Sequence, residues 1–428
     1  MLQKLLNFRE KQESNITLLI NYLFILYAFT LPMAFDTEKI IFKIIFILFL
    51  LSGNLKAKLI YALKNKIFQA MLLFLSVYIV WLYGSEHRDV AIWKIKEFAS
   101  YFFLFPIFIT SIREDFKEKI LNGFIFAIFT SEVLSYFMMF DIKFSFITYT
   151  GFGQNVPFFY MYSQYVLIIS ISLGLILYKI LTNSLKNNFQ KFLYIGFFLF
   201  STINIFSLSS KLGYILYSIS ILTVLIYLSK TYITKQKIII LFAVIVSTYL
   251  VAFNFNTTFH EKVHNIYSEM TKAFEKNIFV GSTGTRLAWG LYGMKVYLEN
   301  NPLVGVGTSD HIDLVAKKLH EKKLTKEEKI WLFIFVNKYV PGRSTLHNEY
   351  LDHLVQFGPF GLFIVFYLFY QIYKAKSVDP YFKLLKYILL ANILIYCFVN
   401  YFFILTQLGK IFFLLIALTL PSFKTKEV

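Results

Sequence analysis

The stretch PFFYMYSQYVLIISISLGLILYK, residues 157–179, decides the fold class. It carries no charged side chain before Lys179, and roughly 20 predominantly apolar residues are enough to cross a membrane as a helix. Similar runs recur along nearly the whole chain, which is 57% hydrophobic, 16% charged and has a mean hydropathy of +0.60. A soluble all-α protein would have to hide all of these runs in one core. The composition therefore predicts a membrane protein.

Twelve apolar runs are candidate membrane spans, although two are short and two pairs are separated only by tight turns. They cover residues 17–35, 39–53, 67–83, 98–112, 119–140, 157–179, 191–209, 211–229, 236–254, 351–373, 382–400 and 403–420. The first run follows basic residues and lacks a small-x-small cleavage site, so we interpret it as an uncleaved helix. The expected fold is an all-α polytopic membrane protein with about twelve transmembrane helices, ten being the lower bound.

Basic residues are distributed unevenly between the connections of these spans. With the N-terminus in the cytoplasm, the short cytoplasmic segments hold most lysines and arginines, and the short external turns hold few. This asymmetry follows the positive-inside rule and predicts an even number of spans. The net charge of +18 therefore reflects topology. Because no basic domain stands free of the membrane, nucleic acid is not an expected partner.

One long hydrophilic insertion, residues 255–350, lies outside the cytoplasmic membrane in this orientation. It divides the chain into residues 1–254 with nine spans, the loop itself, and residues 351–428 with three spans and a cytoplasmic tail. Helix-like apolar spacing recurs in four segments of the loop, 259–277, 285–300, 311–321 and 325–338. A folded external cap favours a functional role at the outer membrane boundary, with a purely structural cap as the alternative.

Start and stop signals refine the second of these helices. Thr285 precedes its first apolar residues and is a candidate N-cap. Asn301-Pro302 is expected to end the helix, and Gly305-Val-Gly307 is expected to turn the chain.

Arginine is scarce, because only five of the 43 basic residues are arginine. Two of the five, Arg286 and Arg343, lie in the external loop. Where lysine is the usual basic residue, an arginine suggests a need for the planar fork that binds phosphate or carboxylate in two places. A solvated salt bridge is the alternative for each.

His347 is the strongest catalytic candidate, since an imidazole can accept a proton near neutral pH. Arg343 lies four residues earlier, so both side chains are expected on one face of a single helix. The alternative is an ordinary polar residue at a helix start. His353 lies six residues further on, about 120° around the helix, and is not expected to share the site.

Two other patterns in the sequence are candidate metal sites. His260-Glu-Lys-Val-His264 matches the H-E-x-x-H pattern of zinc proteases, but Lys262 and the lack of a third ligand at a suitable spacing weigh against it. Asp36-Thr-Glu38, in the first external turn, is similar to the acidic pairs of metal-dependent, lipid-linked glycosyltransferases. Neither pattern is specific enough to predict a metal site or a cofactor.

Charged residues inside the predicted spans point to an ion path or to structural pairs. Glu132 and Lys410 fall within spans and Lys43 lies near the start of one. A transporter would use such charges, but we favour anchors or one structural pair. Cys397 is the only cysteine, which excludes a disulfide within the chain and a cysteine metal site.

The external loop resembles the O-antigen ligase and polymerase superfamily of bacterial membrane glycosyltransferases. The matching residues begin with Thr285-Arg286-Leu-Ala-Trp289 and continue through Asn301-Pro302-Leu-Val-Gly305-Val-Gly307. They end with His347-Asn348-Glu-Tyr350 and the pair Gly358 and Gly361. The order and spacing of these pieces carry the resemblance, together with the number of spans and the position of the loop.

The resemblance implies a GT-C-like enzyme of the bacterial inner membrane with its active site in the periplasm. Such enzymes move a glycan from an undecaprenyl-diphosphate carrier to an acceptor, which for the ligases is a lipid A–core sugar hydroxyl. His347 would match the proposed base and Arg286 a diphosphate-binding arginine. A single displacement would invert the anomeric centre, and no metal or nucleotide sugar would be required.

The chain departs from the family at one position. The family commonly has a second arginine after a serine-containing stretch, where this chain has Phe206-Ser-Leu-Ser-Ser210 followed by Lys211. The charge is kept but the fork is lost, so Arg343 is a candidate to compensate. O-antigen polymerase, O-linked protein oligosaccharyltransferase and a lipid-linked glycan flippase or transporter remain the alternatives to a ligase.

Overall fold

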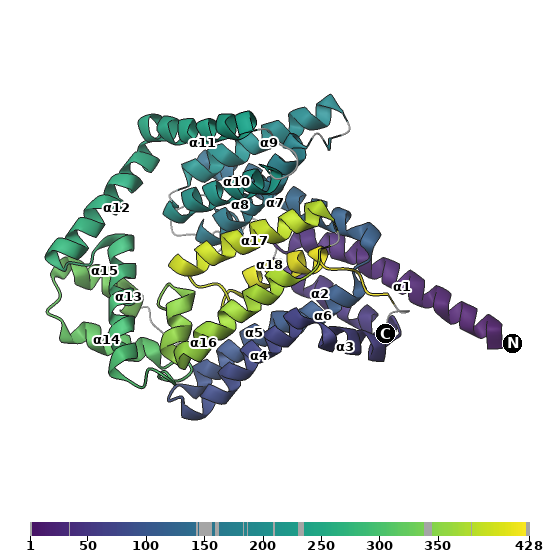
Figure 1. Cartoon of the computed structure of the whole chain (residues 1–428), viewed down its shortest axis with the longest axis horizontal. Helices are drawn as coiled ribbons and strands as arrows, with labels where there is room; N and C mark the ends of the chain where they lie inside the picture. The colour runs from purple at the N-terminus through teal and green to yellow at the C-terminus, as the bar shows by residue number, and fades with distance from the viewer. Residues whose placement is uncertain are drawn as a thin grey trace.

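The computed structural model describes residues 2–33, 35–142, 144, 156–158, 162–182, 184–185, 187–208, 210–229, 235–337, 345–377 and 379–424. Within these ranges the regular elements are helices and none is a strand, as the apolar runs predict (Figure 1). The helices form two parts, a bundle and a cap.

In the part of the chain that the structure describes, the bundle contains fourteen α-helices. They are α1 (Leu2–Thr30), α2 (Phe35–Leu51), α3 (Leu55–Lys64), α4 (Lys66–Trp81), α5 (Arg88–Phe102), α6 (Leu104–Ser111), α7 (Lys117–Met139), α8 (Tyr162–Leu181), α9 (Asn188–Ser207), α10 (Lys211–Ser229), α11 (Lys235–Phe255), α16 (Glu349–Lys374), α17 (Pro380–Val399) and α18 (Thr406–Thr419). The cap consists of α12 (Thr257–Lys276), α13 (Gly281–Glu299), α14 (His311–Glu321) and α15 (Lys326–Asn337).

Seven helical spans in the described residues are long and apolar enough to cross a membrane, and an eighth is counted if a bent pair forms one span. The seven cover Lys66–Gly84, Glu114–Met139, Tyr162–Leu181, Asn188–Ser207, Lys211–Ser229, Glu349–Lys374 and Pro380–Val399. The bent pair joins α2 to α3 at 111°, where Gly53 and Asn54 adopt left-handed backbone angles. The structure thus supports a helical membrane protein, while the number twelve stays a prediction.

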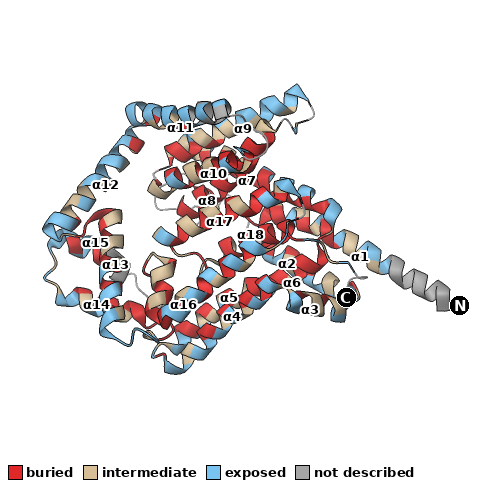
Figure 2. Cartoon of the chain, viewed as in Figure 1, coloured by how far each residue is buried: buried red, intermediate tan, exposed pale blue. Residues whose placement is uncertain are grey.

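Helix α8 lies at the centre of the bundle. Nearly all of its side chains are buried between α9, α10 and α17, and Figure 2 shows exposed residues along α11 and α12 at the rim. Gly174 lets α17 approach closely, because a Cβ there would lie 3.0 Å from the Ile388 side chain. Asn392 of α17 donates a hydrogen bond to Ser220 of α10 at 2.8 Å. Close packing and one buried polar contact thus join these three helices.

The cap has a hydrophobic core of its own. Trp289 and Tyr292 of α13 pack there with apolar residues of α14, and Leu346 from the turn before α16 and Val355 from α16 itself complete it. Because Leu346 directly precedes His347, the packing of the cap also helps to fix the turn that carries His347.

The predicted start of the second cap helix is wrong. Helix α13 begins at Gly281, after Val280, and Thr285 lies inside it with its hydroxyl donating to the Gly281 carbonyl at 2.7 Å. The predicted end is correct, since the helix stops at Glu299 just before Asn301-Pro302.

A backbone junction joins the cap to the bundle. Helix α16 is interrupted at Gly358 (φ 65°), and Pro359 has no N–H to donate to the Val355 carbonyl. The amide of Val306 donates to that carbonyl at 3.0 Å, and Gly307 donates to the Gln356 carbonyl at 3.0 Å. The turn at Gly305–Gly307 thus supplies hydrogen bonds to the carbonyls that the interrupted helix leaves without donors. Both this motif and the glycine at the interruption therefore have a structural role.

Candidate active site

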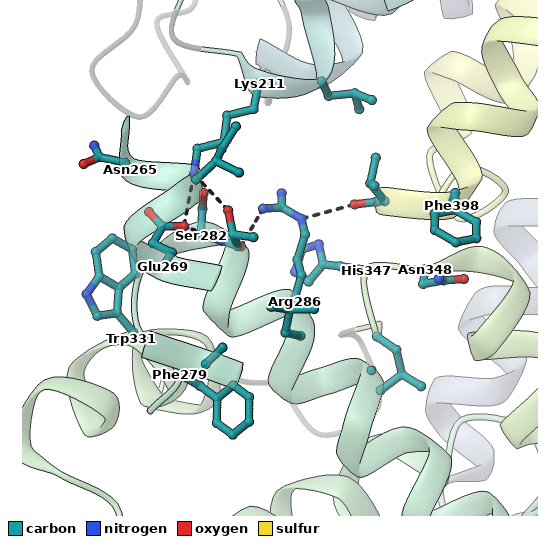
Figure 3. A pocket seen from close by; sticks show the side chains of 18 of the residues that line it. Lys211, Asn265, Glu269, Phe279, Ser282, Arg286, Trp331, His347, Asn348 and Phe398 are labelled. Atoms are coloured by element: carbon teal, nitrogen blue, oxygen red, sulfur yellow. Dashed lines mark hydrogen bonds and ion pairs between the residues drawn. The ribbon is translucent and has the colours of Figure 1, made fainter. Parts of the chain in front are cut away.

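A cavity of about 1130 Å³ lies where α10, α12 and α13 meet the turn before α16 and the end of α17 (Figure 3). Its charged lining consists of Lys211, Lys262, Glu269 and Arg286, and His347 lies in the same wall. The structure therefore brings together three of the predicted site residues, Lys211, Arg286 and His347, from segments far apart in the sequence. The fourth, Arg343, lies outside the described residues.

Lys211 is paired across the cavity. Its Nζ lies 3.0 Å from Oε2 of Glu269 on α12 and donates to the Thr283 hydroxyl at 2.9 Å. Both side chains of the ion pair are largely buried, with 19% and 15% of their surface exposed. The pair joins the first residue of α10 to the middle of α12.

Glu269 also caps helix α13. Its Oε2 accepts a hydrogen bond from the Thr283 amide at 2.7 Å, near the helix start, where Val280 has no side-chain oxygen to serve as a cap. Gly281 (φ 71°) allows this approach, because a Cβ there would lie 2.4 Å from the Glu269 carboxyl group. The same carboxylate thus holds Lys211 and sets the start of the helix that carries Arg286.

Arg286 is held by backbone carbonyls. Its Nε donates to Val399 at the end of α17 at 3.2 Å, and its Nη1 donates to Ser282 at 2.8 Å. No carboxylate pairs with it in the part of the chain that the structure describes. The guanidinium is oriented toward the cavity while its charge is not neutralised (Figure 3).

Lys262 is a further cation of the cavity wall that sequence reasoning did not assign to the site. It lies on α12 two turns before Glu269, and it makes no hydrogen bond or ion pair with any described residue. The only sequence signal is its spacing of seven residues from Glu269 on an amphipathic helix. The described lining holds three cations and one carboxylate, and therefore two uncompensated positive charges.

His347 lies in a turn before α16, at a left-handed backbone angle (φ 53°). The pKa of its imidazole is lowered to about 4, first by burial and then by the positive charge of Arg286, while a side-chain hydrogen bond with Asn400 acts in the opposite direction. The ring also lies 5.5 Å from that of Tyr401. At neutral pH the imidazole is therefore uncharged and able to accept a proton.

The predicted helix carrying both Arg343 and His347 is wrong. Helix α16 begins at Glu349, where the Asn348 side chain accepts a hydrogen bond from the Leu351 amide as an N-cap. The left-handed angle of His347 is incompatible with a continuous helix through it. A shared helical face therefore gives no support to a joint role for the two residues.

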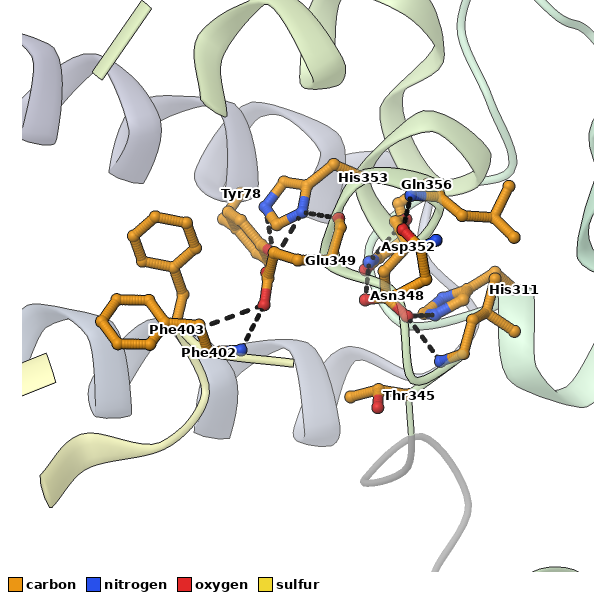
Figure 4. A network of polar contacts seen from close by, with 12 residues as sticks. Tyr78, His311, Thr345, Asn348, Glu349, Asp352, His353, Gln356, Phe402 and Phe403 are labelled. Atoms are coloured by element: carbon orange, nitrogen blue, oxygen red, sulfur yellow. Dashed lines mark hydrogen bonds and ion pairs between the residues drawn. The ribbon is translucent and has the colours of Figure 1, made fainter. Parts of the chain in front are cut away.

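Asp352 fixes one side of the His347 turn through hydrogen bonds to its neighbours (Figure 4). It accepts from the Leu346 amide at 2.9 Å and from His311 Nε2 at 2.8 Å. Gln356 donates to its other oxygen at 2.8 Å. Sequence reasoning missed Asp352 and His311, and nothing near His311 in the sequence indicates this long-range contact.

Glu349 fixes the other side of the turn. Its Oε2 accepts from the amides of Phe402 at 2.5 Å and Phe403 at 3.3 Å, which holds the loop that carries Asn400. His353 lies against the same carboxylate and contacts the Tyr78 hydroxyl at 3.0 Å (Figure 4). His353 belongs to this buried network and does not line the cavity, so the prediction that it does not share the site is confirmed, although the angle on which it rested assumed a helix through His347.

The rival metal patterns gain no support from the described residues. His260 and His264 are exposed on α12, and His260 lies 3.2 Å from the Phe253 carbonyl. Glu38 forms a buried ion pair with Lys410 at 2.7 Å, and the side chain of Asp36 lies outside the description. No group of three His, Cys, Asp or Glu side chains within the described ranges could hold a metal ion.

One of the intramembrane charges fits a structural role. The pairing of Lys410 with Glu38 agrees with the structural pair that we favour from the sequence. Glu132 is buried and accepts a hydrogen bond from the Ser201 hydroxyl at 2.8 Å.

Comparison with known proteins adds one finding. Residues 196–366 match a family model described as O-antigen ligase. This segment contains α10, the whole cap and the His347 turn. No curated protein shows detectable similarity to the chain.

Proposed function

We propose that this chain is an O-antigen ligase, because residues 196–366 match a family model described as O-antigen ligase. The family supports an activity of the ligase or polymerase type on lipid-linked glycans in a membrane. The proposed donor is a glycan on undecaprenyl diphosphate, and the proposed acceptor is a lipid A–core sugar hydroxyl. The observation that carries the proposal is a cavity with excess positive charge beside an uncharged histidine.

The charges of the cavity suit a diphosphate leaving group. A lipid diphosphate linked to a sugar carries one negative charge on each phosphate, and the lining has two uncompensated positive charges. Arg286 would bind the diphosphate through its fork, and Lys211 and Lys262 would bind as point charges. Fixed donors of this kind stabilise charge that develops as the bond to the sugar breaks.

His347 would act as the general base. Its neutral imidazole takes the proton of the acceptor hydroxyl, while the hydroxyl oxygen attacks the anomeric carbon. The bond from that carbon to the diphosphate oxygen breaks, and the electron pair leaves with the diphosphate. A single displacement inverts the anomeric centre. The scheme needs no metal or nucleotide sugar.

The proposed topology is that of the sequence analysis. We place the N-terminus in the cytoplasm, about twelve spans in the inner membrane, and the cavity at the periplasmic face. In this scheme residues 1–254 and 351–428 anchor the enzyme, and residues 255–350 form the periplasmic cap with the catalytic turn at its end.

The lipopolysaccharide profile of a deletion strain complemented with His347→Ala or Arg286→Ala tests the proposal. We expect complete core without O-antigen, and long chains accumulating on the carrier. His264→Ala is the matched control, because that histidine is exposed on α12, and it should restore a normal ladder. Core bearing a single repeat would instead identify a polymerase, and a normal ladder with His347→Ala would exclude the proposed base.

A further inference from the structure

Glu269 is the only carboxylate in the described lining of the cavity. Its Oε2 lies 3.0 Å from Nζ of Lys211, one of the cations that would bind the diphosphate. A negative charge in this position weakens the binding of every anion, so it lowers the affinity of the cavity for the proposed donor. Capping of α13 does not require the charge, because the amide oxygen of a glutamine also accepts a hydrogen bond from an N–H group. The charge itself therefore needs a reason.

The proposed reaction raises the negative charge of the lipid diphosphate. In the donor, each phosphate carries one negative charge. When the bond from the anomeric carbon to the diphosphate oxygen breaks, the electron pair stays on that oxygen, and the proton of the acceptor hydroxyl passes to His347 and then to water. The terminal phosphate of the product is now free, like a phosphate monoester, whose second pKa is about 6. Near neutral pH the product therefore carries about three negative charges.

A cavity with excess positive charge holds this product more tightly than the donor. The attraction to Lys211, Lys262 and Arg286 grows with the charge of the ligand. Slow release of a tightly bound product limits the turnover of many enzymes. The repulsion from Glu269 also grows with the charge of the ligand, so it weakens the binding of the product more than that of the donor.

We propose that Glu269 promotes release of the diphosphate product, because its carboxylate repels the product more strongly than the donor. This inference rests on the proposed function, since it assumes that a lipid diphosphate is the leaving group. The lower affinity for the donor is offset by a faster return of the enzyme to its empty state.

The structure holds this charge in the cavity wall. Oε2 of Glu269 accepts from the Thr283 amide at 2.7 Å, near the start of α13, where the helix dipole is positive. Gly281 leaves room for the carboxylate beside the helix. The Glu269 side chain is only 15% exposed, so its repulsion is screened less than that of an exposed carboxylate. Glu269 therefore acts on a bound anion from a fixed position.

The test compares two probes, undecaprenyl diphosphate and the same lipid with one sugar on its terminal phosphate. Native mass spectrometry of the purified full-length protein in uncharged detergent, at slightly alkaline pH, gives both affinities. Glu269→Gln removes the charge and keeps an acceptor for the Thr283 amide. Both affinities should rise in this variant. The affinity for undecaprenyl diphosphate should rise about three- to tenfold more than that for the sugar-bearing lipid, because the product loses the repulsion of one further charge.

The kinetics of transfer should show the same difference. The donor for this assay is the lipid-linked glycan extracted from the deletion strain. Glu269→Gln should give an initial burst of about one transferred glycan per enzyme, followed by a slower steady rate, because the retained product blocks the next turnover. Added undecaprenyl diphosphate should also inhibit the variant more strongly than the wild type.

Three further variants separate the charge from the cap. Glu269→Asp keeps the charge but retracts it from the Thr283 amide, and should keep most of the wild-type ratio of the two affinities. Glu275→Gln removes a charge from an exposed position of α12 and should leave the ratio unchanged. Asn265→Asp adds a carboxylate to the cavity wall one turn before Glu269, away from the start of α13. It should weaken the product more than the donor, and it decides the inference if Glu269→Gln does not fold.

An equal gain for both probes and no burst in folded Glu269→Gln would overturn the inference and leave only the capping role. The same conclusion would follow if Glu269→Asp behaved like the glutamine variant, or if Asn265→Asp weakened both probes equally. A wild-type protein that binds neither probe would instead contradict the proposed donor. The two failures are therefore distinguishable.

Discussion

Two polar regions meet at the His347 turn and differ in how completely their charges are compensated. In the first region, Asp352 and Glu349 are buried and surrounded by donors from four segments of the chain. In the second, the cavity is lined by half-buried cations with one carboxylate among them. A compensated buried network fixes a structure, whereas unneutralised charge around a cavity is ready to bind a ligand.

The difference predicts separate effects on activity and stability. A substitution in the cavity should reduce transfer and leave the fold intact. A substitution in the network should first destabilise the fold, and should affect transfer through the position of His347.

The largest expected effect is the loss of transfer in His347→Ala. Removal of a general base typically lowers a rate by about 10² to 10⁴-fold, and we expect a loss of this size in transfer by the purified enzyme from a lipid-diphosphate donor. The unfolding midpoint should change little, because the His347 side chain lies in the cavity wall and belongs to neither hydrophobic core. A transfer rate that falls by less than about tenfold would mean that His347 lines the cavity but takes no part in the chemical step.

Asp352→Ala should show the opposite pattern. The substitution leaves the Leu346 amide and the buried His311 without their acceptor, and each buried donor left without a partner costs about 1 to 3 kcal/mol. Titration with denaturing detergent in mixed micelles measures the change in unfolding free energy. Asp379→Ala is the matched control, since this exposed aspartate caps α17 through the Phe382 amide and should cost about 1 kcal/mol. An equal loss of unfolding free energy in the two variants would show that the buried network stabilises the fold no more than an ordinary helix cap does.

Local patterns in the sequence were sufficient for much of the helical structure. The predicted helix 311–321 has the bounds of α14, because apolar spacing and turn residues act over a few positions. The start of α13 was misplaced because its cap is the carboxylate of Glu269, which lies 14 residues before Thr283. The count of spans could not be fixed, since a bend such as that at Gly53 is not visible in hydropathy.

The candidate site shows the same limit. Arg286, Lys211 and His347 were found through rare residue types and a resemblance, and they share the cavity. In the sequence, Lys262 only weighs against a zinc site. Its position in the cavity wall depends on how α12 lies relative to the bundle, which the sequence does not indicate. The left-handed angle of His347 depends on the contact between Asp352 and Leu346, so the sequence alone suggested a helix there.

Arg286→Lys tests whether the cavity needs the guanidinium fork or only its charge. A lysine cannot reach Val399 and Ser282 while also presenting two parallel donors to a diphosphate. We expect the KM for the donor to rise about tenfold, with stability unchanged. Arg88→Lys is the control, because Arg88 also bonds a backbone carbonyl but lies outside the cavity. An unaffected KM would mean that the cavity recognises charge alone.

The smallest effect concerns pH and links Arg286 to the base. The neutral imidazole is the active form, so activity is lost as the pH falls through the pKa of His347. The acid limb of kcat/KM, which reports the free enzyme, should therefore lie near pH 4, well below the usual value for histidine. A bound diphosphate brings negative charge and raises this pKa, so the limb of kcat should lie at higher pH than that of kcat/KM.

Arg286→Gln sharpens this test because it removes the positive charge next to the imidazole. The pKa of His347 should rise, and the acid limb of kcat/KM should move upward by about half a pH unit or more. It should not reach the ordinary value, since burial is the larger cause of the shift and remains in the variant. A limb near pH 6.5 in the wild type would show that water reaches the imidazole freely. The cavity would then lack the low-dielectric surroundings that distinguish its unneutralised charges from ordinary surface charges.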